Sequence, residues 1–309
     1  MNYYNDKTIV YLNGEFVKAS EAKIDLYSQS LHYGYSVFEG IRSYKTIDGH
    51  TQIFKAKEHY DRLQQSAQAV NMPYHWTTEQ LIEATYETLS KNNLQDAYIR
   101  PVIYAPANMS FALNKESFIV IEVWEMQPFL GDKLLRIMTS SFQRPNPKAF
   151  KIYAKATGHY VNSLMASHEA KSAGYDEALL LDMNGYVAEG PGANIFYEKD
   201  GRLFTPSIGN ILPGITRATV LELCTELGIP VEEKLFTIEE LKKADGAFYC
   251  GTAAEVIGWE SIDDTKFPKP WKDTTGRIVQ DAYTNKVKSP AGSNSRAFET
   301  LARKAEETI

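Results

Sequence analysis

The sequence predicts an α/β protein of the α+β type, divided into two domains that each contain strands and helices. The chain has 309 residues, which is long for one small domain. Hydrophobic residues make up 43% of it, enough for substantial cores. The stretch 125–132, which includes Pro128 and Gly131, interrupts the periodic pattern as a domain boundary does. We therefore predict a small N-terminal α/β domain over 1–128, a linker over 129–132 and a larger C-terminal domain over 133–309.

Composition and charge exclude several classes of protein. The formal net charge is −6, whereas a general nucleic-acid-binding protein usually has a basic face. No apolar run approaches the roughly 18 residues that cross a bilayer, and the N-terminus lacks the basic-then-apolar pattern of a signal peptide. The histidines do not have metal-ligand spacing. Cys224 and Cys250 form neither a CxxC pair nor a disulfide framework, so we expect a soluble protein in the reducing cytoplasm.

The first elements follow from turn residues and composition. Asn13 and Gly14 separate two apolar runs and favour the positive φ angles of a type I′ turn, which predicts a hairpin over 9–17. The segment 31–42 is dense in aromatic residues and glycine. We interpret it as a core strand with bends or, alternatively, as the wall of a ligand pocket, because glycine lets a backbone approach a ligand closely.

Two helices are predicted next. A strand over 51–54 precedes a helix over about 57–70. Apolar residues at helical spacing form its buried stripe, which consists of Tyr60, Leu63, Ala67 and Val70. Thr77 and Gln80 have the spacing of a capping box, which predicts a second helix over 77–91.

Strands over 97–104 and 117–124 follow, joined by a loop over 105–110. Tyr98 and Arg100 are two residues apart on the first of these strands, so both side chains leave the same face. An arginine on an apolar strand is unfavourable unless it meets a carboxylate. Arg100 is therefore a candidate for binding an anion, with a structural ion pair as the alternative.

The same signals predict the elements of the C-terminal half. The periodic segments are separated by turn residues such as Asn184 and Gly185 and by a helix start at Thr237. The predicted strands cover 134–139, 177–182 and 246–250, and the predicted helices cover 158–173, 213–227, 271–285 and 295–308.

One lysine stands out in the stretch 152–160. Lys155 lies between Ala154 and Ala156, and we expect it between the end of a strand and the helix over 158–173. A lysine that forms a Schiff base needs small neighbours, so that a planar cofactor can lie against the backbone. The local alternative is a solvated helix lysine.

Three further segments would suit the other groups of a planar cofactor bound to Lys155. Glu189 precedes a Gly-Pro-Gly turn, whose glycines would open space beside the carboxylate, and the local alternative is a solvated turn carboxylate. Gly214 and Thr216 place backbone N–H groups and a hydroxyl at a helix start, and the small-residue turn 251–255 could add amide donors. Together with Lys155, these segments match pyridoxal phosphate, whose aldehyde needs a lysine, whose ring nitrogen needs an acid, and whose phosphate needs amides and a cation.

The order of these segments resembles the fold-type-IV (class IV) aminotransferases, and most closely the branched-chain amino acid aminotransferases. The resemblance runs from about Val10 to Trp259 and is weaker beyond. The residues that carry it are Leu31-His32-Tyr33-Gly34, Val37-Phe38-Glu39-Gly40-Ile41-Arg42, Glu58-His59, Arg62-Leu63, Ala97-Tyr98-Ile99-Arg100-Pro101, Ala154-Lys155-Ala156, Glu189-Gly190, Leu212-Pro213-Gly214-Ile215-Thr216-Arg217 and Gly251-Thr252-Ala253-Ala254-Glu255. The resemblance implies that the C-terminal domain is a pseudo-barrel that binds the cofactor.

A site for pyridoxal 5′-phosphate is implied by the resemblance. Lys155 is expected to form the internal aldimine and to move the proton. Glu189 is expected to bond the pyridine nitrogen, and Tyr160 the phenolic oxygen. The implied phosphate ligands are Arg62, Ile215, Thr216 and Thr252.

A substrate site is implied as well. Tyr98, with the amides near Thr252 and Ala253, should receive the α-carboxylate, and Arg100 should receive the distal carboxylate of glutamate or 2-oxoglutarate. The other implied substrate residues are Tyr33, Phe38, Arg42 and Met109, of which Tyr33 and Met109 would come from a neighbouring subunit of a homodimer or larger homo-oligomer. The expected reaction is a ping-pong transfer of the amino group of leucine, isoleucine or valine to 2-oxoglutarate. Its partners would be small amino acids and 2-oxo acids, with no nucleic acid, membrane or metal.

Other functions fit parts of the sequence. A D-amino acid aminotransferase, an (R)-selective amine transaminase and an aminodeoxychorismate lyase share the cofactor residues. A phosphate-ligand-binding protein without chemistry would explain Thr216 and Thr252 but not Lys155 or Glu189. The departures from relatives, which concern the preferred side chain of the substrate, are His159, Phe129 and Ser110.

Overall fold

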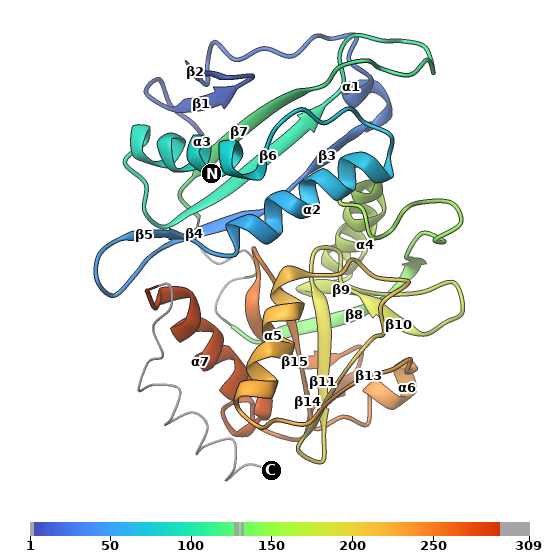
Figure 1. Ribbon diagram of the computed structural model, residues 1–309. Coiled ribbons are helices and arrows are strands. Elements are labelled where there is room, and N and C mark those ends of the chain that lie inside the picture. Colours follow the sequence, from blue (N-terminus) through green and yellow to red (C-terminus); the bar gives the residue numbers. More distant parts are fainter. Residues whose placement is uncertain (1–2, 127–129, 131–132, 291–309) are drawn as a thin grey trace. The chain divides into compact units, whose positions relative to one another are not determined.

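The computed structural model describes residues 3–126, 130 and 133–290 and is shown in Figure 1. The chain forms two compact units. Unit 1 comprises Met1–Gln127 and Tyr153–His159, and unit 2 comprises Pro128–Ile152 and Tyr160–Ile309. The segment with Lys155 thus belongs to unit 1, although residues of unit 2 precede it in the sequence. Of the predicted linker 129–132, only Leu130 is among the described residues; Phe129 and the helix predicted over 295–308 lie outside them.

Unit 1 is built on an antiparallel sheet of seven strands. Six of them follow the order β2-β1-β7-β6-β4-β5, and β3 pairs with β6. The strands are β1 (Ile9–Leu12), β2 (Glu15–Lys18), β3 (Ser36–Phe38), β4 (Ile41–Lys45), β5 (Thr51–Ile53), β6 (Ala97–Tyr104) and β7 (Phe118–Trp124). The first two form the predicted hairpin, because Asn13 and Gly14 adopt φ angles of 51° and 101°.

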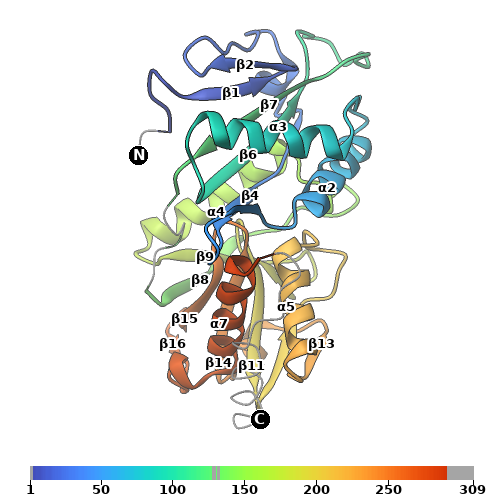
Figure 2. The same ribbon diagram turned by 60° about the vertical axis from the view of Figure 1, so that its left-hand side comes forward.

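Three helices complete unit 1: α1 (Gln29–Tyr33), α2 (Ala56–Ala69) and α3 (Thr78–Lys91). Figures 1 and 2 show α2 and α3 next to each other over the sheet. The predicted stripe of α2 is confirmed, since Tyr60, Leu63 and Ala67 are fully buried in the core of the unit. Thr77 and Gln80 form the predicted capping box.

The stretch before Lys155 is not the end of a strand, and this prediction was wrong. A single β-bridge joins Ala156 to Val37, and a 3-10 turn over Thr157–His159 follows at once. Residues 152–154 form a turn and a bend, and the bridge partner Val37 belongs to a distant segment, so sequence spacing could not show where pairing begins. After the lysine, the Thr157 hydroxyl donates to the carbonyl of Gly34 at 2.6 Å.

Unit 2 contains a mixed sheet of nine strands in the order β10-β9-β8-β15-β14-β11-β12-β13, with β16 paired to β15. β8 runs parallel to both β9 and β15, and β12 runs parallel to β13. The strands are β8 (Leu135–Gln143), β9 (Glu177–Leu181), β10 (Val187–Glu189), β11 (Asn194–Lys199), β12 (Arg202–Thr205), β13 (Val231–Glu233), β14 (Gly246–Gly251), β15 (Glu255–Ile262) and β16 (Thr265–Lys266). β8 extends four residues beyond its predicted end at 139.

The helices of unit 2 are α4 (Tyr160–Ser172), α5 (Ile215–Glu226), α6 (Ile238–Leu241) and α7 (Thr275–Lys288). α4 packs on β8 and β9, whereas α5 and α7 lie side by side against β14 (Figure 2). Within residues 3–126 and 133–290, no helix is long and apolar enough to cross a membrane.

Candidate active site

The backbone of Lys155 is fixed on both sides within unit 1. Its carbonyl accepts a hydrogen bond from the N–H of Phe38 at 3.0 Å, and its N–H donates to Ser66 Oγ at 2.9 Å. The flanking Ala154 and Ala156 are buried, as a Schiff-base lysine requires. The Lys155 Nζ atom lies 4.8 Å from the centroid of the Phe38 ring. Lys155 is therefore a half-buried side chain on an anchored backbone, and not a solvated helix residue.

Two glycines bring the lysine segment close to the start of β3. Gly34 has a φ of 64°, and its carbonyl accepts a hydrogen bond from the N–H of Gly158 at 3.0 Å. A Cβ on Gly34 would lie 3.0 Å from the Cα of Gly158, which is too close for an unstrained contact. The glycine in the aromatic segment 31–42 is therefore needed for a close approach of two backbones.

Arg62 belongs to a buried charged cluster. Its guanidinium donates from Nε to Glu39 Oε1 at 2.7 Å and from Nη2 to Glu39 Oε2 at 2.9 Å. His59 Nδ1 lies 2.7 Å from the same Oε2. All three side chains are buried. The structure thus places the predicted phosphate-binding arginine on a two-point contact with a carboxylate.

The protonation states of this cluster follow from burial and charge. Burial opposes ionisation of Glu39, but the charge of Arg62 and the hydrogen bonds from Arg62 and His59 outweigh it, so the pKa of Glu39 lies well below its ordinary value. Burial lowers the pKa of His59, although the Glu39 carboxylate opposes that shift. An ionised carboxylate only accepts hydrogen bonds, so we assign a neutral His59 with its proton on Nδ1.

Arg100 lies among aromatic rings rather than against a carboxylate. Its guanidinium carbon is 4.7 Å from the Phe38 ring centroid and 5.3 Å from that of Tyr98, and Nη2 donates to the Tyr98 hydroxyl at 3.1 Å. Trp124 adds a third ring at 6.0 Å. Aromatic faces stabilise the cation, and the Phe38 ring has Lys155 as a second cationic neighbour.

Among the residues that the structure describes, Arg100 has no carboxylate within 4 Å, but Glu122 lies opposite it on β7. Burial raises the pKa of Glu122, although the charge of Arg100 opposes that shift. The choice between an anion-binding role and a structural one for Arg100 stays a prediction.

Tyr98 also explains a glycine. A Cβ on Gly40 would lie 2.0 Å from the Tyr98 hydroxyl oxygen, so no other residue fits there without moving Tyr98. Arg42 stands directly opposite Tyr98 across β4 and β6 and lies 5.2 Å from the Tyr44 ring centroid. The predicted substrate residues Arg42, Tyr98 and Arg100 therefore occupy one region of unit 1.

Tyr33 and Met109 lie together on the surface of unit 1. The Tyr33 hydroxyl is 3.4 Å from the carbonyl oxygen of Met109, and the two residues are 46% and 48% exposed. Phe111 is 91% exposed, with its ring centroid 5.5 Å from that of Tyr33. A contiguous group of exposed apolar side chains is typical of an interaction surface.

Glu189 lies at the end of β10 in unit 2 and is buried. Its carboxylate accepts hydrogen bonds from Asn194 Nδ2 at 3.0 Å and from the N–H of Leu212 at 3.1 and 3.2 Å. Arg144 Nε lies 3.0 Å from Glu189 Oε1, an ionic contact that is not aligned as a hydrogen bond. Each of these neighbours is a donor or a cation, so the carboxylate acts as an acceptor only.

The glycine after Glu189 does not open space for a ligand, contrary to the prediction. A Cβ on Gly190 would lie 2.7 to 2.9 Å from atoms of the Tyr249 side chain, which is fully buried and fills that space. At Gly192, by contrast, a Cβ would meet nothing within 4 Å. Packing against Tyr249 therefore explains Gly190.

The predicted anion-binding segments of unit 2 lie near Asn194. A Cβ on Gly214 would be 2.0 Å from Asn194 Oδ1, so this side chain packs against the start of α5. Gly214 is the N-cap and gives no side-chain hydrogen bond to the helix, and Thr216 is buried in the first turn. Asn194 also opens β11, which pairs with β14 and so adjoins the turn with Thr252 and Ala253. Helix-start and turn N–H groups are donors for anions.

The structure groups the predicted residues within each unit. Ile215 and Tyr160 are the partly buried first residues of α5 and α4. Unit 1 holds Tyr33, Phe38, Arg42, Arg62, Tyr98, Arg100, Met109 and Lys155, and unit 2 holds Tyr160, Glu189, Ile215, Thr216, Thr252 and Ala253. Unit 1 thus contains an amine, guanidinium groups and aromatic rings, and unit 2 contains a buried carboxylate and the N–H groups of a helix start and a turn.

Four residues of this arrangement were missed by sequence reasoning about chemistry. Arg144 is buried and follows β8 directly, but the strand was predicted to end at 139, so the sequence did not place this arginine at a strand end. Glu39 and His59 were noted only as part of a family pattern, although His59 lies three residues before Arg62 on the same helix face. Nothing local to Asn194 indicates its contact with Glu189.

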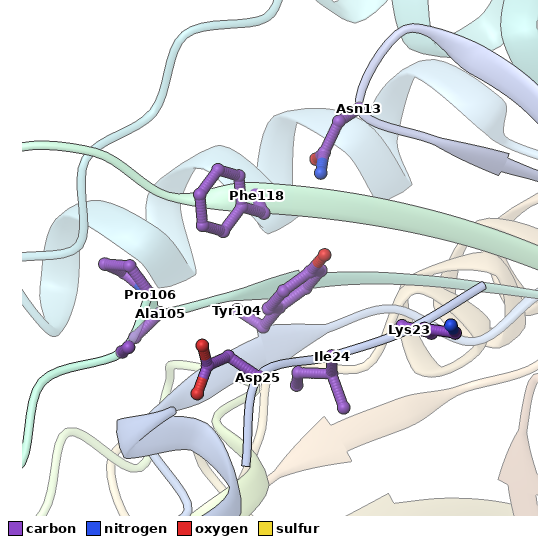
Figure 3. Close-up of a pocket in the computed structure, with 9 residues that line it drawn as sticks. Asn13, Lys23, Ile24, Asp25, Tyr104, Ala105, Pro106 and Phe118 are labelled. Carbon is purple, nitrogen blue, oxygen red and sulfur yellow. The ribbon is translucent and has the colours of Figure 1, made fainter. Parts of the chain in front are cut away.

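A pocket elsewhere in unit 1 contains none of the predicted residues. It has a volume of about 420 Å³, and Figure 3 shows it between Tyr104 and Phe118, from β6 and β7, and the segment with Ile24 and Asp25. Its lining also includes Asn13, Lys23, Ala105, Pro106 and Ala107. Lys23 and Asp25 are its charged residues. In the described part of the chain, no three His, Cys, Asp or Glu side chains are grouped to hold a metal ion.

Comparison with known proteins gives consistent matches. The family model described as amino-transferase class IV matches residues 36–262. A branched-chain-amino-acid aminotransferase of Pseudomonas aeruginosa is 39% identical over 285 residues, which are 90% of this chain and 92% of the relative. The protein of the same name from Escherichia coli K12 is 40% identical over 283 residues, covering 89% of this chain and 91% of the relative.

Solved structures match over almost the whole chain. The branched-chain aminotransferase of Thermoproteus uzoniensis with norvaline has a TM-score of 0.87 and 37% identity, and covers 91% of this chain and 94% of its own. The branched-chain amino acid aminotransferase of Thermobaculum terrenum in its PLP form has a TM-score of 0.83 and 34% identity, covering 92% and 94%. These matches confirm the predicted fold class.

Proposed function

The chain belongs to the class IV aminotransferases, and on this premise we propose that it transfers the amino group of branched-chain L-amino acids to 2-oxoglutarate, with pyridoxal 5′-phosphate as its cofactor and a ping-pong course. Among its own residues, the observation that carries the proposal is the anchored backbone of Lys155 with its buried alanine neighbours. The branched-chain substrates rest on the relatives, which carry that name at about 40% identity over most of the chain.

The donor set fits the proposed cofactor. The neighbours of Glu189 are donors or cations, so its carboxylate can accept the N–H of a protonated pyridine ring. The first turn of α5 is not capped by a side chain of Gly214, and its N–H groups suit a phosphate. Arg62 supplies the cation that a phosphate also needs, and Ile215, Thr216 and Thr252 are proposed to complete the phosphate ligands.

When bound, pyridoxal phosphate supplies an aldehyde that takes up amino groups and a ring that withdraws electrons. Lys155 is proposed to hold the aldehyde through its amine and to carry the proton from the α-carbon of the substrate. Glu189 holds the proton at the ring nitrogen, and Tyr160 donates a hydrogen bond to the phenolic oxygen. A positioned proton carrier is typically worth about 10²- to 10⁴-fold in rate.

Two kinds of substrate side chain must be accommodated by unit 1. Phe38 offers an apolar wall to an aliphatic chain, and Arg100, held beside that ring, offers a charge to the distal carboxylate of 2-oxoglutarate. The Tyr98 hydroxyl, together with the amides of the turn at Thr252 and Ala253, is proposed to bind the α-carboxylate. Arg42, opposite Tyr98, lines the same region.

We also infer a homodimer or larger homo-oligomer. Each unit exposes apolar side chains in a group, which are Leu31, Tyr33, Met109, Phe111 and Leu113 in unit 1, and Val161, Leu164 and Met165 on α4 in unit 2. Monomeric proteins rarely expose such groups. Tyr33 and Met109 would then contribute to the site of the neighbouring subunit. A cytoplasmic location is supported by the two cysteines, which are buried and unpaired.

Half-reaction spectra test the proposed function. The purified protein should be yellow, and its colour should bleach when L-leucine is added without any oxo acid. D-leucine is the matched control and should leave the spectrum unchanged, because the D-specific and (R)-specific relatives accept the opposite hand. Lys155→Ala should lose turnover by more than about 10⁴-fold, since it removes the covalent attachment and the proton carrier together. Normal turnover in that variant would overturn the assignment.

A further inference from the structure

Helix α2 carries a second buried face besides its apolar stripe. His59, Arg62 and Ser66 recur at i, i+3 and i+7 and are 1%, 8% and 1% exposed. Polar groups are buried at this density only when they are paired. Ser66 Oγ accepts from the backbone N–H of Lys155, whereas His59 and Arg62 both bind Glu39.

Glu39 connects this helix face to the strand that anchors Lys155. It directly follows β3, whose last residue, Phe38, donates its N–H to the Lys155 carbonyl. The Glu39 N–H in turn donates to the carbonyl of Pro101 at 3.0 Å, which fixes its backbone to β6. The carboxylate is therefore held at a set position, and the arginine that binds it is held with it.

The contact with Glu39 uses one edge of the Arg62 guanidinium. Nε and Nη2 form a two-point fork on the carboxylate. Because the five N–H donors of a guanidinium lie in one plane, a fork on Glu39 fixes both the plane of the Arg62 guanidinium and the direction of its remaining donors. An unconstrained arginine side chain has many rotamers, whereas the two hydrogen bonds to Glu39 restrict Arg62 to one rotamer.

His59 completes the arrangement without adding charge. Its Nδ1 donates to Glu39 Oε2, the oxygen that also accepts from Arg62 Nη2. Since burial lowers the pKa of His59, the cluster holds one anion and one cation at neutral pH. Replacing such a buried pair by apolar residues is often neutral for stability, so stability alone does not account for its presence.

We propose that Glu39 and His59 are positioning residues that orient Arg62 to receive the phosphate group of the cofactor. This inference rests on the proposed function, because it requires a phosphate ligand at Arg62. Neither Glu39 nor His59 contacts the phosphate; both act through the guanidinium.

Binding of two ligands that differ only in the phosphate tests this inference. Full-length apoprotein is titrated with pyridoxamine 5′-phosphate and, separately, with pyridoxamine, neither of which needs the Lys155 amine for attachment. Glu39→Gln keeps the shape of the side chain but loses the charge and one acceptor. We expect it to weaken pyridoxamine 5′-phosphate by about 10- to 100-fold, the usual effect of losing a hydrogen bond to a charged group. Pyridoxamine should bind as it does to the wild type.

Further variants keep the test decisive. Glu198→Gln removes a matched buried carboxylate of unit 2, which pairs with Lys269, and should leave both ligands unaffected. If Glu39→Gln does not fold, His59→Asn, which retains a donor near the Nδ1 position, is compared with His59→Ala; only His59→Ala should weaken the phosphorylated ligand. In a double-mutant cycle, Glu39→Gln should have no further effect once Arg62→Gln is present.

The outcomes separate this inference from the proposed function. Unchanged affinity of Glu39→Gln for pyridoxamine 5′-phosphate, or an equal loss for both ligands, would overturn the positioning role, because an equal loss is what a general structural defect produces. A wild-type protein that binds neither ligand would instead overturn the proposed function.

Discussion

Glu39 in unit 1 and Glu189 in unit 2 stand in almost the same local setting. Glu39 directly follows a three-residue strand, and Glu189 ends one. Both are buried, and a glycine follows each of them. Each glycine packs against a tyrosine that leaves no room for a side chain. Tyr98 fills this space at Gly40, and Tyr249 fills it at Gly190.

The two carboxylates differ in how an arginine meets them. Arg62 binds Glu39 through two aligned hydrogen bonds, whereas the Nε atom of Arg144 lies 3.0 Å from Glu189 Oε1 but off the hydrogen-bond direction. A neutral amide and a backbone N–H also donate to Glu189. A forked pair satisfies both partners within the protein. The two carboxylates thus share burial and local sequence but differ in the geometry of their arginine. If the roles proposed for them are right, that geometry distinguishes the carboxylate that positions a side chain from the one that binds the cofactor.

The largest expected effect concerns Glu189→Gln. If Glu189 holds the proton at the ring nitrogen, the neutral amide should lower kcat by about 10²- to 10³-fold, the range seen when one preorganised electrostatic contact is lost. Bound cofactor, measured by absorbance after dialysis, should stay near the wild-type content. Glu39→Gln should behave in the opposite way, with lost cofactor affinity and a kcat close to normal at saturating cofactor. Equal losses of kcat in both variants would break the comparison.

The two glycines should respond differently to alanine. Gly190→Ala presses a methyl group against Tyr249, which is fully buried and donates from its hydroxyl to the carbonyl of Ala178 at 2.6 Å. Overpacking of this kind costs about 1–3 kcal/mol of unfolding free energy, to be measured by urea titration.

Gly40→Ala instead displaces the Tyr98 hydroxyl, which accepts from Arg100. Because leucine and 2-oxoglutarate both carry the α-carboxylate that Tyr98 is proposed to bind, its main effect should be a raised KM for both substrates, of several-fold or more. A Gly40→Ala protein with wild-type KM values for both substrates would contradict the role proposed for Tyr98.

Signals local in the sequence predicted much of the fold and part of the site. The hairpin at Asn13, the buried stripe of α2 and the capping box at Thr77 each depend on residues within one element or turn. Lys155 and Glu189 were recognised because their neighbours have unusual composition. Their roles remain predictions, since they depend on a ligand.

Contacts between distant segments could not be predicted. Glu39 meets Arg62 only because α2 packs on β3, and Arg144 meets Glu189 only because β8, β9 and β10 adopt their register. The wrong prediction of a strand before Lys155 has the same origin, since its one bridge partner, Val37, lies in a three-residue strand of unit 1. Sequence spacing carries no information on such pairings.

The smallest expected effect is on acid stability, and it follows from the sign of two pKa shifts. The folded pKa of His59 lies below its ordinary value of 6.5, so the neutral ring stabilises the fold above that pH and the contribution declines as pH falls below it. The folded pKa of Glu39 lies below its ordinary value of 4.5, so its stabilisation is present above pH 4.5 and is lost on further acidification. Between pH 4.5 and 3 this loss amounts to about 1–2 kcal/mol of unfolding free energy for one group.

Urea titrations at several pH values should therefore show a shallower fall of stability with acid for Glu39→Gln than for the wild type. A fall of stability with acid for Glu39→Gln as steep as that of the wild type would show that the fork at Glu39 confers no special stabilisation on the ionised carboxylate.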